Sequence, residues 1–579
     1  THERSSAASD VYKRQYVFIL LFSLPCLVAG QVDNRVWYDG NSRAMFYRDA
    51  LSGESKDQDT TSARSNGEGY TAIDLGIHFN PSKEIEIFSE IRIKNDFGYM
   101  WGSGAYVELR RLSVRGVLND RVSFNLGDIY LKQTSYTLYN NLQELSKNEP
   151  SVFNSYRDLI NYENYYQENF WRTQGIQSNF SYTFYNAIKS VELDGFASRV
   201  RGNQWLGKPE LLMLGGTSVL RLENNLKFSA NFINSFEVQS TSLDSLTYNN
   251  PVYNIQGSYF KKLSMGVFFL KLDVGASSRS WSKTNGSEET FIEDKGNFLK
   301  LKGTLKNTNN TFGFAFKYTD PNFRSSGAQT KRIIYNSSLS TYPYYTNNTL
   351  LRPVSLLDIT TDPNIYNQRL STTLMSFNPK YGAVNPYGDA TPNRVGVSGD
   401  YKFKNNKIET SLVLNLFSEV IGQGTTNNRS LFSSGASIRA NLEEFIKIKN
   451  KTTLELSSYL EAVNRGGNNV ESISFNSSLL SAGLSYELFK DLKIIAGAKV
   501  FLAKGNEFET ERNEYDQITG YNIKNYDSEE NIYLIGLQYS FTKDIYFSLQ
   551  SNKINIVNQL IEQDRLALSR IYFMFNMNL

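Results

Sequence analysis

The sequence predicts an all-β fold, a transmembrane antiparallel up-and-down β-barrel of about 22 strands, within a range of roughly 20 to 24. Three observations predict it. Aromatic residues make up 14% of the 579 residues and only 12 residues are Pro, which favours strands with unbroken hydrogen-bond ladders. Past residue 70, apolar and polar residues alternate with a period of two. The links between the alternating segments are short and long in turn.

The N-terminal segment is typical of an export signal and is not expected to join the fold. Lys13 and Arg14 precede residues 16–30, an apolar run that ends in small residues suited to cleavage. The run is shorter than the about 20 apolar residues of a spanning helix. Residues 1–15 show no period and resemble non-native read-through. We therefore expect residues 31–579 to form a single barrel.

Each predicted strand is a segment in which one face is apolar and the other polar. In the last predicted strand, every second residue is apolar up to the end of the chain: Ile571, Phe573, Phe575, Met577 and Leu579. The predicted strands are 34–48, 70–80, 84–95, 103–117, 120–131, 172–184, 188–200, 209–222, 225–239, 251–261, 264–281, 296–306, 309–320, 393–404, 406–419, 430–442, 446–463, 470–488, 492–504, 531–542, 543–557 and 564–579.

The length of the links decides between a soluble sandwich and a membrane barrel. Tight turns such as Pro81-Ser82-Lys83 alternate with long polar loops. The long loops are 49–69, 132–171, 282–295, 321–392 and 505–530. A sandwich has no reason to sort its loops in this way, whereas barrels carry short periplasmic turns at one rim and long extracellular loops at the other. Closure also follows from the solvent, because an unpaired amide in hydrocarbon costs several kcal/mol.

This pattern resembles the porin-like outer-membrane β-barrel proteins of Gram-negative bacteria, and the Asn, Tyr and Lys richness is similar to such proteins from the Bacteroidota. The resemblance covers residues 31–579 and includes no specific motif. It implies export through the periplasm, insertion by the barrel-assembly machinery, and a wall against outer-membrane lipid and lipopolysaccharide. The size also resembles TonB-dependent transporters, but the about 40 residues from Gln31 to Tyr70 are too few for their plug domain.

An unplugged barrel of this size would be a very wide pore, so we expect the loops 132–171 and 321–392 to narrow it. Charged residues of both signs lie on the polar face of the third to fifth strands, where they are expected to line the pore. They are Glu84, Glu86, Glu90, Arg92, Lys94, Glu108, Arg111, Arg115 and Asp128. They could form a transverse field that selects solutes, or they could pair with one another as a salt-bridged lining. A phase shift at Arg110-Arg111 predicts a β-bulge.

The two long loops are rich in aromatic residues. The candidates are Tyr162, Tyr165, Tyr166, Trp171, Tyr342, Tyr344 and Tyr345. Their rings could stack on sugars or form a docking surface for a partner, or they could pack the loops onto the rim or into the lumen. The polar lumen also leads us to expect no packed core.

The composition excludes several kinds of site. Beyond the export signal the chain keeps one His, His78, and no Cys, so we expect no catalytic residues, no metal site and no cofactor. His78 is expected to be a solvated lumen residue near the short-turn rim, whereas a surface hydrolase would need its histidine near the long loops, so this geometry argues against a hydrolase. The net charge of +3 gives no indication of a nucleic-acid partner, and the sequence does not define an oligomeric state.

The function expected from these observations is a porin-like channel for diffusion or selective uptake of small hydrophilic solutes. The alternative is a non-conducting barrel that acts as an anchor or partner in a surface, adhesion or secretion complex.

Overall fold

The structure is a computed structural model. It describes residues 35–53, 65–97, 105–141, 148–165, 167–185, 187–202, 209–238, 246–285, 288–329, 370–375, 377–446, 448–561 and 565–579. The predicted export signal, residues 16–30, and the residues before it lie outside this described part.

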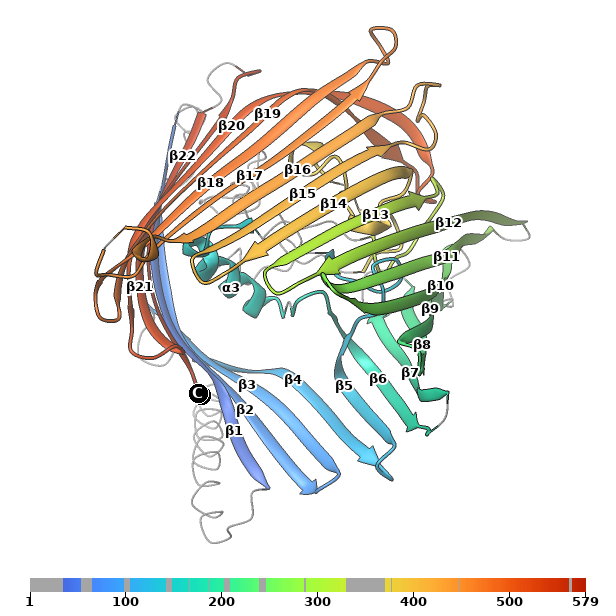
Figure 1. The fold of residues 1–579 in the computed structure, drawn as a ribbon, viewed down its shortest axis with the longest axis horizontal. Coiled ribbons are helices and arrows are strands. Elements are labelled where there is room, and N and C mark those ends of the chain that lie inside the picture. The colour runs from blue at the N-terminus through green and yellow to red at the C-terminus, as the bar shows by residue number, and fades with distance from the viewer. Residues whose placement is uncertain are drawn as a thin grey trace, which may run out of the picture.

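The described residues form a closed antiparallel barrel of 22 strands (Figure 1). The strands are β1 (Val36–Ser52), β2 (Ser65–Ser82), β3 (Ile85–Asp96), β4 (Ala105–Leu118), β5 (Val122–Leu131), β6 (Trp171–Thr183), β7 (Ile188–Arg201), β8 (Glu210–Leu222), β9 (Leu226–Val238), β10 (Leu246–Leu263), β11 (Gly266–Asn285), β12 (Glu288–Lys306), β13 (Asn310–Thr319), β14 (Arg394–Lys404), β15 (Ile408–Ser418), β16 (Ser430–Asn441), β17 (Thr452–Arg465), β18 (Ile473–Phe489), β19 (Leu492–Arg512), β20 (Ile518–Ser540), β21 (Ile545–Asn558) and β22 (Arg565–Asn578). Each strand pairs with its neighbours in sequence, and β22 pairs with β1 from Asn578 opposite Asn41 to Ala567 opposite Ser52. The predicted fold class is confirmed.

Period-two alternation places apolar side chains on the outside of the barrel. Leu412, Leu414 and Leu416 of β15 are exposed, as is Ile535 of β20, whose side chain is 61% exposed. A soluble protein would rarely expose so many large apolar residues, but lipid is a suitable solvent for them. The exposed outer face therefore identifies the wall of a membrane barrel. None of the described helices is long and apolar enough to cross a membrane.

Two predicted loops are largely strand. The predicted loop 505–530 is wrong, because β19 and β20 extend as a hairpin to a short turn at residues 513–517. The predicted loop 282–295 likewise belongs mostly to β11 and β12. The physical reason is that two paired strands can continue beyond the bilayer, where neither face has to be apolar. The residues there show no alternation of apolar and polar side chains, so the sequence pattern did not identify them as strand.

The lumen contains the described parts of the loops 132–171 and 321–392, as expected. The first loop forms the 3-10 helix η3 (Ser151–Phe153) and the helix α3 (Asn154–Glu163), which lies inside the barrel in Figure 1. The second includes η4 (Pro379–Tyr381) and η5 (Gly388–Ala390).

The loops pack against the wall in apolar clusters. In one cluster Tyr136 stacks on Phe298 of β12, with 3.9 Å between ring centroids, and both rings meet Phe323 edge-on. A second cluster joins Val384 to Phe475 of β18 and its neighbours. The expectation that the lumen holds no packed core is therefore wrong. Its apolar residues are scattered through polar loops, so they formed no periodic pattern.

Candidate functional site

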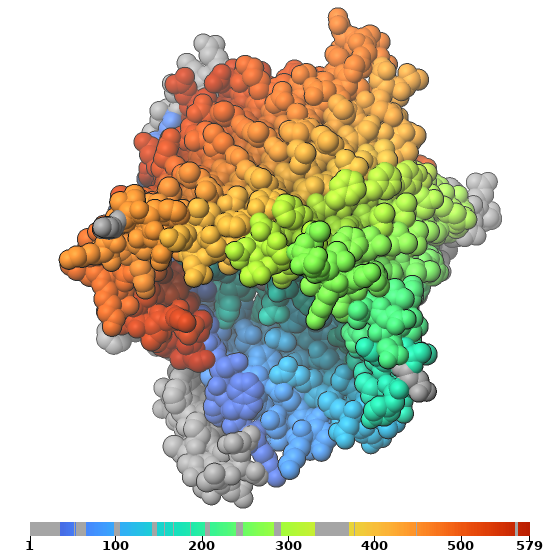
Figure 2. All heavy atoms as spheres, in the orientation of Figure 1, coloured from blue at the N-terminus to red at the C-terminus, as the bar shows by residue number. Residues whose placement is uncertain are grey.

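A large polar cavity opens at the rim formed by the short turns. We call it the vestibule; it has a volume of about 1140 Å³, and its lining includes the β12–β13 turn at Asn307 and Thr308. Figure 2 shows this face hollowed between the strands β12–β13 and the strands β1–β4. An inner cavity of about 230 Å³ shares Asn148, Glu149 and Lys300 with the vestibule. The two cavities therefore adjoin each other, and together they lie between the short-turn rim and the lumen.

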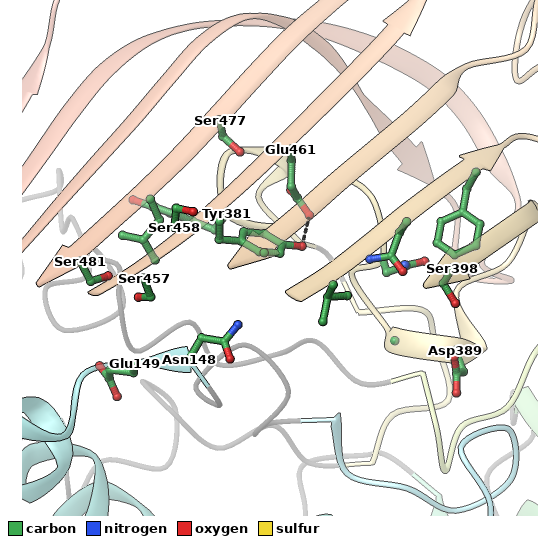
Figure 3. A pocket seen from close by; sticks show the side chains of 18 of the residues that line it. Asn148, Glu149, Tyr381, Asp389, Ser398, Ser457, Ser458, Glu461, Ser477 and Ser481 are labelled. Carbon is green, nitrogen blue, oxygen red and sulfur yellow. Dashed lines mark hydrogen bonds between the residues drawn. The ribbon is translucent and has the colours of Figure 1, made fainter. Parts of the chain in front are cut away.

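Small polar side chains create the inner cavity. The strand register brings Ser398, Ser457, Ser458, Ser477 and Ser481 from β14, β17 and β18 to its wall (Figure 3). Gly435 of β16 pairs with Tyr459, and the Tyr459 hydroxyl donates to Glu461 at 2.8 Å. A wall of Ser and Gly stands close to the backbone, so it leaves space that larger side chains would fill. The opposite side of the cavity is provided by loop residues, including Asn148 and Asp389.

Charged loop residues of this cavity are paired with wall lysines. Lys300 contacts Asp389 at 2.5 Å, and Lys317 donates to the Gly388 carbonyl at 3.2 Å. Burial would raise the pKa of Asp389, but the two lysines outweigh burial and hold the pKa of this carboxyl well below its ordinary value. Glu149 pairs with Arg157 at 2.9 Å and with Lys499 of β19. The cavity therefore presents fixed charges of both signs beside hydroxyl and amide groups.

Most of the predicted pore-lining charges form ion pairs on the β1–β6 side of the barrel. Arg115 bonds Glu86 at 2.7 Å, Lys94 bonds Asp96 at 2.9 Å, and Asp128 bonds Arg172 at 3.0 Å. Glu90 and Arg92 join the cluster described next. Three others have different settings: Glu84 lies in the turn before β3, Glu108 is exposed, and Arg111 lies over aromatic rings. This geometry favours the salt-bridged lining over an open transverse field.

A buried cluster anchors α3 to the wall. Arg43, Arg92 and Arg110 converge on Glu163 at the end of the helix; Arg92 contacts it at 2.6 Å and Arg110 at 3.9 Å. Asp74 completes the cluster, because it pairs with Arg92 at 2.7 Å and with Arg110 at 2.8 Å. Burial would raise the pKa of Glu163, but the three arginines lower it to about 2.

The sequence analysis missed the decisive members of this cluster. Glu163 lies in a loop without periodicity, 120 residues from Arg43, so no spacing rule connects the two. Arg110 could have been found, because the predicted bulge is confirmed. Glu90 pairs with Arg111 and Ile91 pairs with Leu109, which makes Arg110 the extra residue. The bulge turns its side chain into the buried interior.

The described candidate aromatics pack the loops against the wall. Tyr162 donates to Asp74 at 2.6 Å and Tyr165 donates to the Arg110 carbonyl at 3.1 Å. Trp171 donates from Nε1 to the Gly327 carbonyl at 3.0 Å. Tyr166, Tyr342, Tyr344 and Tyr345 lie outside the described residues. The three placed rings therefore fit the packing interpretation.

His78 is buried, so the expectation of a solvated histidine is wrong. It lies on the lumen side of β2, stacks on Trp37 with 3.3 Å between ring centroids, and contacts Glu86 at 2.5 Å. Its other nitrogen lies 3.3 Å from Asp39. Trp37 is the feature that the sequence analysis did not consider, since it belongs to the adjacent strand β1 and pairs directly with His78.

At the long-loop end of the barrel, the turn of the β19–β20 hairpin contacts β11 and the loop 321–392. Asp516 in this turn is 1% exposed and contacts Arg279 of β11 at 2.5 Å, Arg324 of the loop 321–392 at 3.3 Å and Arg512 at 3.6 Å. Tyr515 also meets Trp281 of β11 edge-on. The hairpin tip therefore reaches across the mouth from β19–β20 to β11.

The chain was compared with family models, with curated proteins and with solved structures. No family model and no curated protein matches the chain. Among solved structures, a BenF-like porin from Pseudomonas fluorescens Pf-5 is 7% identical, with a TM-score of 0.32 over 94% of this chain and 99% of that chain. The ferric citrate transporter FecA in its unliganded form is 8% identical, with a TM-score of 0.47 over 93% of this chain and 79% of that one. The FrpB iron transporter from Neisseria meningitidis is 7% identical, with a TM-score of 0.45 over 93% and 82%. The fold assignment rests on the strand pairing itself, and these similarities transfer no substrate: the chain is a 22-stranded antiparallel membrane β-barrel.

Proposed function

We propose that this protein is an outer-membrane channel for small hydrophilic solutes, and that the structure represents a state closed at the long-loop end. The observation that carries the proposal is the pair of adjoining cavities, the vestibule at the short-turn rim and the inner cavity beyond it, whose linings together define a path with many polar groups. Hydroxyl, amide and paired charged groups can replace the hydration of a polar solute in such a path. An apolar solute would gain nothing from them. The proposal includes a barrel inserted in the bacterial outer membrane among lipid and lipopolysaccharide.

The path also explains why the solute should be small. The inner cavity measures about 230 Å³, and loop residues such as Asn148 face the strand wall across it. Loop displacement would widen it, because Asn148 and Glu149 belong to the loop and not to the barrel. We expect passage to require movement of the hairpin tip at the opposite end.

The test is single-channel conductance of the refolded protein in a planar bilayer, with Gly435→Trp as the blocking variant. Gly435 lines the inner cavity, and a Cβ there would lie 3.4 Å from the Tyr459 ring, so an indole must enter the path. The matched control is Ala436→Trp, because the alternation of β16 points the next residue to the lipid side. Conductance that falls with Gly435→Trp and not with Ala436→Trp supports the channel. Equal conductance in both variants contradicts this path.

A second candidate is a non-conducting barrel that serves as an anchor or partner in a surface complex. The observation that favours it is the tight anchoring of both lumen loops, by the Glu163 cluster and by the apolar clusters. A barrel shown to be folded that stays silent even after the anchoring contacts are removed would support this candidate over the channel.

A further inference from the structure

One part of the barrel wall is not closed by strand pairing. β4 and β5 pair only from Ser113 opposite Gly127 to Leu118 opposite Val122, next to their shared turn. On the side of β5, none of the described strands pairs with residues 105–112 of β4. Residues 128–131 of β5 pair with β6 alone. Figure 1 shows the two strands diverging from the turn. We call this open stretch the seam.

Side chains close the lumen side of the seam. The Arg111 guanidinium lies over the rings of Phe88 on β3 and Tyr130 on β5, 4.9 Å from each centroid, so it spans the two strands behind β4. Arg172 donates to the Arg110 carbonyl at 2.6 Å, and the Leu112 amide donates to Asp128 at 2.8 Å. These contacts give the Arg110 carbonyl and the Leu112 amide hydrogen-bond partners in the absence of a neighbouring strand.

The lipid side of the seam is apolar and open. Val107 and Leu109 of β4 are 57% and 59% exposed, among the higher values of the outer face. Arg111 is the eighth residue of β4 counted from Leu118, about 23 Å along the strand. A strand tilt of about 45° reduces this to a depth of about 16 Å from the short-turn rim, so the seam begins near the middle of a hydrocarbon layer of about 30 Å. Lipid tails cannot pair with the N–H and C=O groups of β4 at that depth, and each unpaired group costs several kcal/mol. At the depth of Arg111, lipid headgroups lie too far away to pair with these groups.

The structure assigns the seam as a docking site for an extended peptide segment of a partner protein, which adds a strand to residues 105–112 of β4 and carries an acidic side chain. A peptide strand alone supplies alternating donors and acceptors at the spacing of the β4 edge. The acidic side chain follows from the two guanidinium groups: Arg111 and Arg172 each keep a buried Nε–H with no acceptor. Arg111 also has no ion pair within the described part of the chain. A second copy in the same membrane orientation would present β4 in parallel, a weaker pairing.

The test uses the protein in phosphatidylcholine nanodiscs and a defined probe, a ten-residue peptide of alternating Val and Thr with a central Glu and one terminal Cys. The chain's one Cys, Cys26, lies in the predicted export signal, so Leu109→Cys provides a single thiol in the barrel. The control is Leu412→Cys, which is also lipid-exposed but lies on β15, a strand paired on both sides. We expect disulfide capture of the peptide to be at least about tenfold faster at Leu109→Cys.

Two peptide variants separate strand addition from simple partition into lipid. N-methylation of alternate amides should abolish the preference for Leu109→Cys, and replacing the central Glu by Gln should slow capture. Arg111→Gln should slow capture of the Glu peptide and leave the Gln peptide unchanged. Equal capture at both cysteines, undiminished capture of the N-methylated peptide, or equal capture of Glu and Gln peptides would overturn the proposal. So would disulfide-linked barrel dimers formed without peptide, or loss of capture in lipopolysaccharide nanodiscs, which would assign the seam to a second copy or to lipid.

Discussion

Removal of the Asp516 charge should open the long-loop end of the barrel. In the variant Asp516→Asn the hairpin tip loses the carboxylate that contacts Arg279, Arg324 and Arg512. Breaking a buried ion pair by removing one partner costs about 3 to 5 kcal/mol. Arg279 keeps Asp294 as a partner, which places the expected cost near the lower end. Since every 1.4 kcal/mol is a factor of ten, about 3 kcal/mol raises the population with a released tip roughly 100-fold.

The contribution of Arg324 supports this magnitude. Its guanidinium is buried, and burial together with the neighbouring Arg279 lowers its pKa to about 10, while Asp516 opposes that shift. Without the Asp516 carboxylate, the Arg324 guanidinium still donates to the carbonyls of Pro321 and Phe323, at 3.1 and 2.9 Å, but it loses its contact with a negative charge. Two facing arginines would then repel each other across the mouth.

The assay is the open probability of single channels in a planar bilayer. The matched control is Glu511→Gln, which removes an exposed carboxylate from the same hairpin. We expect Asp516→Asn to open far more often than the parent and Glu511→Gln to match the parent. The reasoning is refuted if both variants match the parent while electrophoresis shows the barrel to be folded, because the tip would then not hold the mouth closed.

Three further outcomes are expected. Glu163→Gln should release α3 and increase the size and frequency of conductance steps, because removal of this carboxylate from its arginine cluster costs the same about 3 to 5 kcal/mol. The control is Asp158→Asn on the same helix, which should leave the conductance steps unchanged because 66% of the Asp158 side chain is exposed. Because the pKa of Glu163 is depressed, its anchoring of α3 is fully present above the ordinary value of 4.5 and is lost as the pH falls through about 2. Conductance measured against pH should therefore stay constant from pH 7 to 4.5. A change in conductance near neutral pH would contradict this assignment. Gly127→Ala should lower the unfolding midpoint in urea by the equivalent of about 1 to 3 kcal/mol, because Gly127 has φ +95° and a Cβ there would lie 2.4 Å from the Leu112 carbonyl oxygen. The control is Gly195→Ala, which should be close to neutral because a Cβ at Gly195 meets nothing within 4 Å.

The strands were predictable because lipid imposes a rule on every other residue. Alternation and link parity together predicted 22 strands and their order, even for the weak first strand, whose partner turned out to be β22. The bulge at Arg110 was also visible, as a shift in apolar phase from Leu109 to Leu112.

The lumen was not predictable in the same way, because its contacts follow no period. Asp516 meets Arg279 across 237 positions of sequence, and Glu163 meets Arg43 across 120. Polar loop residues of this kind look identical in sequence whether they extend into water or fold inward. The pairing of Trp37 with His78 shows the same limit, since it required the β1–β2 register and not only the identity of the strands.

The enclosed loops have a consequence for the order of assembly. α3 is bound by strands from the start of the chain through Arg43 and Arg92, and near the end of the chain Tyr572 of β22 lies within hydrogen-bond distance of Ser155, at 3.1 Å. A folded segment of this size cannot be threaded into a finished cylinder. The loop must therefore be in place while β1 and β22 are still apart, and zipping of Asn41–Ser52 onto Ala567–Asn578 becomes the step that encloses it. Because that contact joins the two ends of the chain, the slowest and last event of biogenesis should be the closure of this single pair of strands.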